Sequence, residues 1–388
     1  MKNYKFYENK FISKKDRCKI SDIDKKELKK DFYNSNILIL GAAGSIGNAF
    51  TKRLIEFEFK NLYLIDKNEN DLTGLNREIV LTTKYEKIIK IRYICSDLTL
   101  MNIDNFIKKN KITHYLNFAA LKHVRSEEEL ISLKYMFLTN SKNFLPLKKH
   151  SLKKVFSVST DKTVNSTSLL GMSKMLMEKK LSKFKKDNSK VFVSSTRFAN
   201  VSFSNGSILK YVVDRISEKK IFGIPRTIRR YFITHEEASS LCFKSLLKRN
   251  NNMILIPNKK FLSKEYLIKD IVVKILKIDK YKPYFLNTIN AHKNKNIKIN
   301  KSYPVHLTEP NTDGQKLYEE FYENSEKVYP DKKDKTISKV MLPISGDVNK
   351  IVNNVLKFGD INKIKSYLTK NFKSYKSPKD IIQISKYL

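Results

Sequence analysis

The sequence is poor in cysteine, glycine, proline and tryptophan, and these shortages exclude several classes of protein. Its 388 residues include ten glycines, nine prolines and no tryptophan, which argues against collagen-like or low-complexity chains. The three cysteines, Cys18, Cys95 and Cys242, are too far apart for a disulfide framework or a metal cluster, so we expect a reducing, cytoplasmic setting and no metal site. No apolar run approaches the roughly 18 residues that a membrane-spanning helix needs. The charged first 30 residues contain no signal-peptide core.

Positive charge, in contrast, is present in excess. The sequence has 77 Lys and Arg residues against 39 Asp and Glu, a formal net charge of +38. Such a charge suggests a partner such as nucleic acid or an anionic membrane. However, the lysines are spread along the chain in short runs, and abundant Lys, Asn, Ile, Tyr and Phe are typical of an AT-rich coding sequence. We therefore interpret most of the charge as compositional bias and expect no nucleic-acid partner.

Short apolar runs alternate with amphipathic stretches from about residue 34 to residue 208. The runs predict strands, and the stretches between them predict helices. Strands are predicted at 36–40, 61–66, 88–95, 114–120, 154–159 and 191–196. Strands that alternate with helices form βαβ units and a parallel sheet, so the sequence predicts a doubly wound α/β fold of the Rossmann type.

The alternation stops near residue 209, and the whole pattern predicts four segments. They are a basic N-terminal extension (1–33), a dinucleotide-binding domain (34–208), a smaller C-terminal α/β substrate-binding region (209–345) and a helical tail (346–388). The tail is predicted to be helical because Val348, Ile351, Val352 and Val355 recur at helical spacing. The composition of the extension does not indicate its role.

A glycine-rich turn of the pattern G-x-x-G-x-x-G joins the first predicted strand to the first predicted helix. Small residues at such a turn let a pyrophosphate approach the backbone N–H groups that begin the helix. Asp66 ends the second strand 19 residues after the last glycine, near the spacing of a carboxylate that binds the adenosine ribose. This carboxylate would repel a 2′-phosphate, so the expected cofactor is NAD rather than NADP. The predicted cofactor-binding residues of the turn are Gly41, Ala43, Gly44, Ser45, Ile46 and Gly47.

Residues after the third and fourth strands complete this predicted cofactor site. Asp97 and Leu98 follow the third strand, and Asp97 would suit the adenine amino group, although a solvated loop acid is the alternative. Ala119 and Ala120 end the fourth strand with small side chains where a cofactor would cross the sheet. The C-terminal ends of parallel strands open into one crevice, so these positions are expected to converge.

The fifth strand ends in a polar segment that belongs to a wider set of motifs. Residues 157–174 read SVSTDKTVNSTSLLGMSK, and residues 117–124 read NFAALKHV. Further motifs are TRFANV at 196–201, NGS at 205–207, RYF at 230–232 and GQKLYEE at 314–320. This set resembles the extended short-chain dehydrogenase/reductases, and within them the polysaccharide-biosynthesis branch of nucleotide-sugar 4,6-dehydratases and epimerases. The resemblance covers roughly residues 36–325, in the order found in the family.

Two positions depart from the family pattern. The superfamily motif Tyr-x-x-x-Lys has its acid/base tyrosine where this chain has Leu170, which cannot titrate. Membrane-associated dehydratases of the same branch also lack that tyrosine but keep the Thr-Asp-Lys triplet, so Leu170 does not by itself imply loss of activity. Gln315 replaces a usual glutamate, which puts any charge-dependent role at that position in doubt.

The resemblance implies catalytic roles for the polar segment. A 4,6-dehydration oxidises C4 of a sugar, removes the C5 proton and releases the C6 hydroxyl as water. By resemblance, Lys162 is the candidate C5 base and Asp161 the candidate C6 acid, while Thr160 would contact O4 in place of the missing tyrosine. Lys174 would hold the nicotinamide ribose and lower nearby pKa values by its positive charge. The alternative for the Thr-Asp-Lys triplet is a capped turn with a surface ion pair.

Substrate-binding residues are expected at the same edge of the sheet. Lys122 and His123 would contact the sugar or its phosphate, unless they are a loop cation and a packed histidine. Asn200 and Arg230 would suit a diphosphate, since guanidinium groups make forked contacts with phosphates. Elsewhere, Arg197 is predicted to be structural.

The neighbouring acids Glu319 and Glu320 are predicted to lie on a solvated helix face rather than to form a catalytic pair. The sequence is compatible with three functions. The first is an NAD-dependent 4,6-dehydratase acting on UDP-N-acetylglucosamine for surface-glycan biosynthesis. The second is a 4- or 5-epimerase on the same scaffold, and the third is a catalytically weak NAD-binding protein with a polyanion-binding surface. The family further implies a homo-oligomer.

Overall fold

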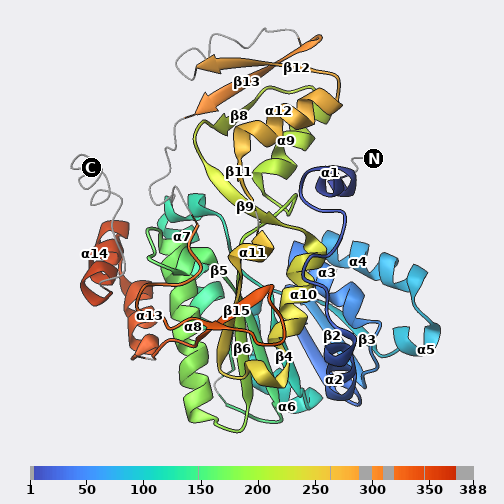
Figure 1. Ribbon diagram of the computed structural model, residues 1–388. Helices are drawn as coiled ribbons and strands as arrows, with labels where there is room; N and C mark the ends of the chain where they lie inside the picture. The colour runs from blue at the N-terminus through green and yellow to red at the C-terminus, as the bar shows by residue number, and fades with distance from the viewer. Residues whose placement is uncertain are drawn as a thin grey trace.

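The computed structural model describes residues 4–146, 148–262, 264–287, 299–308, 319–344 and 346–372. Figure 1 shows a large sheet flanked by helices in the lower part of the view and a smaller α/β unit above it. Gln315, where the sequence departs from the family, lies outside the described residues.

The main sheet explains the succession of apolar runs in the sequence. Within the described residues it has nine strands, in the order β14-β15-β10-β6-β5-β4-β1-β2-β3. β15 (Ile337–Met341) runs antiparallel to both β10 and β14 (Tyr329–Pro330). The parallel strands are β1 (Asn36–Leu40), β2 (Asn61–Asp66), β3 (Ile91–Cys95), β4 (His114–Asn117), β5 (Lys154–Thr160), β6 (Phe192–Phe198) and β10 (Met253–Pro257).

The position of β1 inside this sheet has a consequence for ligand binding. β1 pairs with β2 on one side and with β4 on the other, and its apolar residues are fully buried. Burial on both faces produces a continuous apolar run instead of an alternating one. The chain order reverses between β1 and β4, and sheets of this kind bind ligands at the reversal. The predicted doubly wound α/β fold is confirmed.

Helices flank the main sheet (Figure 1). α3 (Ser45–Leu54) packs against α10 (His235–Ser245), and the stacked rings of Phe50 and Phe243 have centroids 4.2 Å apart. α8 (Leu169–Asp187) packs against β5, β6 and α7 (Leu130–Phe137). In the part of the chain that the structure describes, no helix combines the length and the apolar character needed to cross a bilayer. The other connections contain α4 (Glu69–Thr82), α5 (Tyr85–Ile88) and α6 (Ile103–Asn110).

The smaller unit has an apolar core of its own. β12 (Lys282–Asn287), β13 (Ser302–Thr308) and β8 (Phe222–Pro225) form a parallel sheet in that order. Residues of α9 (Ile208–Ser217) and α12 (Ile268–Ile278) pack with those of this sheet.

A third sheet joins this unit to the end of β6. It consists of β11 (Glu265–Leu267), β9 (Arg229–Ile233) and β7 (Asn200–Val201), and α11 (Lys259–Leu262) contacts β9. Because β7 follows β6 almost directly, this sheet starts at the edge of the main sheet where ligands are expected.

The N-terminal segment is packed into the molecule. α2 (Asp22–Phe32) contributes the buried side chains of Leu28 and Phe32 to the main core, and Cys18 is fully buried as well. α1 (Tyr4–Phe11) packs against the smaller unit, where the Tyr7 hydroxyl donates to Asp279 Oδ1 at 2.6 Å. Residues 4–33 therefore contact both parts of the fold.

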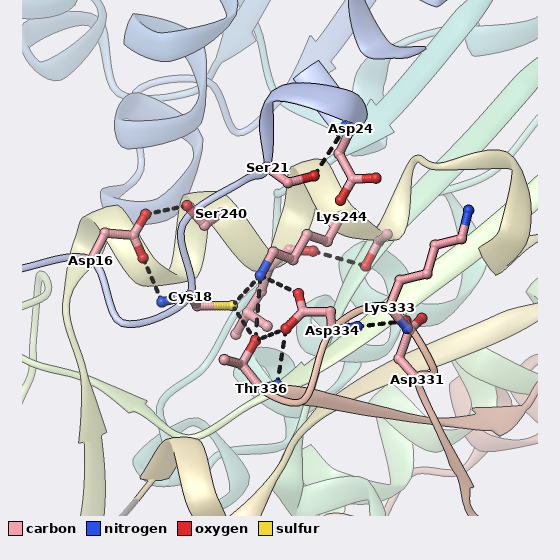
Figure 2. Close-up of polar contacts among 12 residues, drawn as sticks. Asp16, Cys18, Ser21, Asp24, Ser240, Lys244, Asp331, Lys333, Asp334 and Thr336 are labelled. Carbon is pink, nitrogen blue, oxygen red and sulfur yellow. Dashed lines mark hydrogen bonds and ion pairs between the residues drawn. The ribbon is translucent and has the colours of Figure 1, made fainter. Parts of the chain in front are cut away.

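Polar contacts fasten this N-terminal segment to α10 and to the loop before β15 (Figure 2). The Lys244 ammonium donates to Cys18 Sγ at 3.1 Å and to Thr336 Oγ1 at 3.3 Å, and it pairs with Asp334. Burial raises the pKa of the Cys18 thiol to about 11, so the sulfur remains a neutral thiol. These contacts account for a buried lysine within an otherwise apolar core.

Asp24→Asn is expected to lower the free energy of unfolding by about 1.5–3 kcal/mol, because two charge-assisted hydrogen bonds from Arg249, at 2.6 and 2.9 Å, are lost. Burial acts to raise the pKa of Asp24, but the contacts with Arg249 outweigh it, and the folded-state pKa lies below its ordinary value. The stabilisation is therefore present at neutral pH and is lost as the pH falls through that lowered pKa. Urea unfolding at neutral and acid pH measures it.

Asp22→Asn is the matched control, because Asp22 is exposed on the same helix. This variant should change the free energy of unfolding by less than about 0.5 kcal/mol. Equal losses in the two variants would contradict the assignment of the stabilisation to the Asp24–Arg249 pair.

Two C-terminal helices, α13 (Val348–Lys357) and α14 (Ile361–Asn371), form an apolar cluster with α7 and α8. Val348, Val352 and Val355 are buried in this cluster, which explains their helical spacing in the sequence. Leu170 from α8 lies in the same cluster.

Candidate active site

The glycine turn after β1 is too tightly packed for larger residues. Gly41 has φ +70°, and a Cβ atom on it would lie 2.5 Å from the backbone nitrogen of Ala119. A Cβ atom on Gly47 would lie 2.1 Å from the carbonyl oxygen of Gly41. α3 begins at Ser45 with Gly44 as its N-cap, which has no side chain to cap the first amides. These N–H groups are the type that binds a phosphate at a helix N-terminus.

Asp66 lies directly beside this turn. Its Oδ2 accepts a hydrogen bond from the backbone of Ala43 at 2.9 Å, and its Oδ1 accepts one from Asn68 at 3.0 Å. The adjacent Lys67 donates to the Tyr135 hydroxyl at 3.3 Å, and its ammonium lies 5.0 Å from the centroid of that ring. Lys67 thus contacts α7, and Asp66 remains next to the predicted phosphate site.

Asp97 is also held in place by neighbouring groups. Its Oδ1 accepts from the Thr99 backbone at 2.8 Å and from the Thr99 hydroxyl at 2.7 Å, while Oδ2 accepts from Tyr135. Burial acts to raise the pKa of Asp97, but these hydrogen bonds outweigh it and lower the pKa overall. Leu98, next in sequence, is buried. Asp97 is therefore an ordered, ionised group and not simply a solvated loop acid.

The segment after β4 is fixed by a buried asparagine that sequence reasoning missed. Asn140 accepts from the backbone of Leu121 at 2.9 Å and donates back to its carbonyl oxygen at 2.9 Å. Asn140 also donates to Ser173 Oγ at 3.0 Å, which links this segment to α8. Ala119 lies against the glycine turn, and Ala120 is exposed.

Thr160, Asp161 and Lys162 meet in one hydrogen-bonded cluster at the C-terminal end of β5. The Thr160 hydroxyl donates to Asp161 Oδ1 at 2.8 Å, and the Lys162 ammonium donates to the same oxygen at 3.2 Å. The Asp161 side chain is 8% exposed and the Lys162 side chain 37% exposed. Asp161 and Lys162 thus form an ion pair in which the carboxylate is largely buried and the lysine side chain reaches solvent.

Lys174, on α8, contacts β5, the strand that leads into this cluster. Its ammonium donates to the carbonyl oxygen of Val158 at 2.7 Å and is buried. Burial lowers the pKa of Lys174 to about 7, and the charge of Glu178 only partly opposes this effect. The permanent positive charge expected at Lys174 is therefore only partly present near neutral pH.

The low pKa of Lys174 makes a testable prediction for dinucleotide binding. An anionic cofactor favours the protonated amine, so its affinity should fall by up to about tenfold for each pH unit above 7. Calorimetric titrations of the protein with NAD at several pH values between 6 and 9 measure how steeply the affinity depends on pH. Lys174→Met should remove this dependence, and Lys179→Met, on the same helix, should keep it. An identical slope in the Lys174→Met protein would contradict the prediction.

Leu170 is a buried residue of an apolar cluster, and its side chain cannot replace the tyrosine of the family motif as an acid or base. Its side chain is 3% exposed and packs in the apolar cluster with α7 and α13. The carboxylate of Glu127 accepts from the backbone of Leu169 at 3.0 Å and of Leu170 at 2.9 Å, and so caps α8. Sequence reasoning did not identify Glu127, because nothing local links it to the start of α8.

Lys122 and His123 lie in two different surroundings. Loss of water, together with the positive charge of Lys162, lowers the pKa of Lys122. The His123 ring lies against Gly206, where an added Cβ would be 2.3 Å from its Cε1 atom. The Asn205 backbone donates to Ser45 Oγ at 2.8 Å. The NGS motif therefore lies between the loop after β4 and the glycine turn.

Glu319 is where the sequence prediction was wrong. It is not helical, and its carboxyl accepts from the Asn200 side chain and, at 2.6 Å, from the backbone of Tyr231. Arg230, next in sequence on β9, is close enough for its charge to act on this carboxyl. Glu320 is exposed, but it too lies outside any helix. The structure thus places the carboxyl group of Glu319 in contact with Asn200 and within range of the charge of Arg230, two residues that were predicted to bind the substrate.

The position of Glu319 follows from the segment after it, which packs against the turn after β5. Arg197 donates to the carbonyl oxygen of Phe321 at 2.9 Å and pairs with both Glu178 and Glu326. Asn165 donates through its backbone to Glu323 at 3.3 Å. Arg197 is therefore structural, as predicted, since it ties this segment to α8.

Comparison with known proteins identifies the family. Residues 37–340 match the family model described as polysaccharide biosynthesis protein. The chain is 27% identical over 235 residues to the capsular polysaccharide biosynthesis protein CapD of Staphylococcus aureus, covering 58% of this chain and 38% of CapD. It is 24% identical over 235 residues to an inverting UDP-N-acetylglucosamine 4,6-dehydratase of Campylobacter jejuni, covering 58% and 67% of the two proteins. It is also 29% identical over 200 residues to a UDP-glucose 4-epimerase of Rickettsia bellii, covering 49% and 55%.

A solved structure shares the fold. The X-ray structure of Pen from Bacillus thuringiensis has a TM-score of 0.65 at 19% identity, covering 84% of this chain and 98% of Pen. The match to CapD spans less than two thirds of that protein's length. The family model nevertheless covers most of the chain, so the resemblance drawn from the sequence motifs is confirmed. The chain belongs to the polysaccharide biosynthesis protein family.

Proposed function

We propose that this protein is an NAD-dependent nucleotide-sugar 4,6-dehydratase that acts on UDP-N-acetylglucosamine in the cytoplasm. The observation that carries the proposal is the contact of Thr160 and Lys162 with Asp161 at the end of β5. A dehydratase needs both an acid and a base beside one sugar ring, and this cluster contains both. The dehydratase of C. jejuni among the relatives supports the same assignment.

The glycine turn fits the proposed dinucleotide. A Cβ atom at Gly41 or Gly47 would fill the space on which the close packing of the turn depends, and the first amides of α3 lack a side-chain cap. The turn would hold the pyrophosphate, Asp66 the adenosine ribose and Asp97 the adenine. Asp66 favours NAD over NADP because a carboxylate repels a 2′-phosphate. When bound, NAD would supply the hydride acceptor that oxidation of a sugar alcohol requires.

A single proton shift inside the cluster would prepare both catalytic groups. Lys162 needs a neutral amine to remove the C5 proton, and Asp161 needs a proton to release the C6 hydroxyl as water. The two groups already share a hydrogen bond of 3.2 Å. Transfer of the lysine proton along this bond produces the free base and the protonated acid together, and Thr160 holds the acceptor oxygen in place.

Cationic and amide groups around the cluster would bind the nucleotide diphosphate. Arg230 and Asn200 lie on neighbouring strands, β9 and β7, and the charge of Lys162 acts on Lys122. Charge-assisted hydrogen bonds from such groups are suited to phosphate oxygens. His123, whose ring contacts Gly206, would line the same edge.

Incubation of the purified protein with NAD and UDP-N-acetylglucosamine tests the proposal. Mass spectrometry should detect a product that has lost one water molecule. Unchanged substrate across a panel of nucleoside-diphosphate hexoses would contradict it.

An epimerase is the second candidate, because the matched relatives include a UDP-glucose 4-epimerase. An epimerase would form a product of unchanged mass with altered ring-proton couplings in the NMR spectrum. The same incubation therefore distinguishes the two reactions.

A further inference from the structure

The loop of residues 203–207 touches two parts of the proposed nucleotide site. The backbone of Asn205 donates to Ser45 Oγ at 2.8 Å, at the first residue of α3. One residue further along the loop, an added Cβ on Gly206 would lie 2.3 Å from the ring of His123. The loop therefore meets both the helix end where the pyrophosphate would bind and a residue that would line the substrate edge.

The backbone of this loop has a conformation that phenylalanine does not favour. Phe203 has φ +51° and Gly206 has φ +71°. Glycine adopts this left-handed region freely, but phenylalanine adopts it only where the surrounding structure holds it there. The side chain of Phe203 is buried, at 4% exposed. The groups that pack on its ring therefore help to hold the whole loop in place.

Two tyrosines of α1 pack on the Phe203 ring. The ring centroids of Tyr4 and Tyr7 lie 6.3 and 6.2 Å from that of Phe203. The hydroxyl groups of both tyrosines are bound to the smaller unit. Tyr7 donates to Asp279 Oδ1 at 2.6 Å, at the end of α12, and Tyr4 donates to Asp214 of α9. The two rings are thus fixed before they meet the loop.

Glu8 binds α1 to the residue that precedes the loop. Its buried carboxyl group accepts from the Ser202 hydroxyl at 2.6 Å and from the backbone of His235, the first residue of α10, at 3.3 Å. Ser202 is directly followed by Phe203. α1 therefore contacts two consecutive residues at the start of this loop, one through a hydrogen bond and one through aromatic packing.

The loop connects α1 to α3 beside a cavity between these two helices. The cavity has a volume of about 450 Å³, and its walls include Tyr4 and Glu8 from α1, Ser45 from α3, and Phe203. Side chains of the two helices face each other across this open space. The loop contacts α1 through Phe203 and α3 through Asn205, so a displacement of α1 would reach Ser45 through the loop.

We propose that α1 positions the loop of residues 203–207 for nucleotide binding, with Tyr7 and Phe203 as the positioning residues. Their contact holds the Asn205 amide on Ser45, at the end of α3 where the pyrophosphate would bind. The inference rests on the proposed function, because the NAD site at α3 is part of it. It gives the N-terminal segment a role that its composition did not indicate. Neither positioning residue needs to touch NAD, since both act through Ser45.

Hydrogen exchange followed by mass spectrometry tests the position of the loop without any ligand. In Tyr7→Ala the amides of residues 203–207 should exchange at least about tenfold faster than in the wild type, because the loop loses a packing partner. Exchange in β4 should not change, which shows that the main sheet is intact. Tyr7→Phe should keep the wild-type exchange in the loop, since it retains the ring and loses only the hydrogen bond to Asp279.

Tyr33→Ala is the matched control, because Tyr33 is a tyrosine of the same N-terminal segment and is 72% exposed. This variant should exchange like the wild type throughout the loop. Unchanged exchange of residues 203–207 in Tyr7→Ala would overturn the proposal, because the loop would then hold its position without α1.

Calorimetric titration with NAD tests whether the position of the loop matters for binding. The dissociation constant should rise about fivefold or more in Tyr7→Ala and in Ser45→Ala, which removes the acceptor of the Asn205 amide. It should stay within about twofold of the wild type in Tyr7→Phe and Tyr33→Ala. The double variant Tyr7→Ala/Ser45→Ala should bind NAD no more weakly than the weaker single variant, because both substitutions break the same connection.

Three outcomes of this titration would overturn the proposal, and one of them also contradicts the proposed function. Additive losses in the double variant would mean that Tyr7 and Ser45 act separately. Wild-type NAD affinity in Tyr7→Ala, with faster exchange in the loop, would make the packing on Phe203 purely structural. A wild-type protein that binds no NAD would contradict the proposed function itself, and with it the role of the loop in binding.

Discussion

Asp161→Asn is expected to lower the rate of water loss from UDP-N-acetylglucosamine by about 10²–10⁴-fold. Asparagine has nearly the same volume, and its oxygen can still accept from the Thr160 hydroxyl. It cannot carry the proton that the C6 hydroxyl needs, and it cannot receive a proton from Lys162. The loss should therefore appear in kcat, because the interactions that bind the substrate are not removed.

The measurement is the initial rate of product formation by mass spectrometry, with calorimetric titration of NAD as a check on the cofactor site. Asp187→Asn is the matched control, since Asp187 ends α8 and forms an exposed pair with Lys183. That variant should turn over at the wild-type rate. If Asp161→Asn retains a rate within about threefold of the wild type, Asp161 is not the acid. The proton would then have to come from a group outside the cluster.

The centre of the site could be predicted from the sequence because its geometry is local. A strand that ends in glycine and leads into a helix determines where the first amides of α3 lie, and Gly41 at φ +70° shows why glycine is needed. The position of Asp66 could be predicted for the same reason, since parallel pairing of β1 with β2 places it beside the turn. Asp161 and Lys162 are adjacent in sequence, so their contact also needs no long-range information.

The parts that could not be predicted depend on contacts between distant segments. Glu319 reaches Asn200 across 119 residues, and no periodicity in its own segment indicates which strands it meets. The N-terminal segment shows the same limit. Its charge suggested an extension, yet Phe32 and Cys18 are fully buried in the main core. A local pattern reveals that a face is apolar, but it does not reveal the partner that covers it.

Leu170 shows how a single substitution can mislead an interpretation of a motif. The superfamily motif has a catalytic tyrosine at this position, so the sequence alone suggests that a catalytic group has been lost. In the structure Leu170 is part of the apolar cluster with α13. Lys174, on the same helix, contacts Val158 and Met177 of the main core instead, and burial there lowers the pKa of its ammonium. Because Leu170 cannot titrate, the proposed proton transfers are assigned to Asp161 and Lys162.

Gly47→Ala is expected to weaken NAD binding by more than about 100-fold and to lower the free energy of unfolding by about 1–3 kcal/mol. The added methyl group would lie 2.1 Å from the Gly41 carbonyl oxygen and 3.0 Å from its carbonyl carbon. Both atoms belong to the backbone, so relief requires movement of the turn away from α3. Such a movement displaces the amides that would meet the pyrophosphate, because they start at the same helix terminus.

Gly74→Ala separates this steric effect from the general effect of replacing a helical glycine. Gly74 lies on α4, and an added Cβ would have no atom within 4 Å. Alanine has the higher helix propensity, so this variant should be more stable by about 0.5–1 kcal/mol and should bind NAD like the wild type. Calorimetric titration with NAD and urea unfolding give both quantities for each protein. Wild-type NAD affinity in Gly47→Ala would contradict the placement of the cofactor on this turn, because a displaced pyrophosphate site cannot retain its contacts.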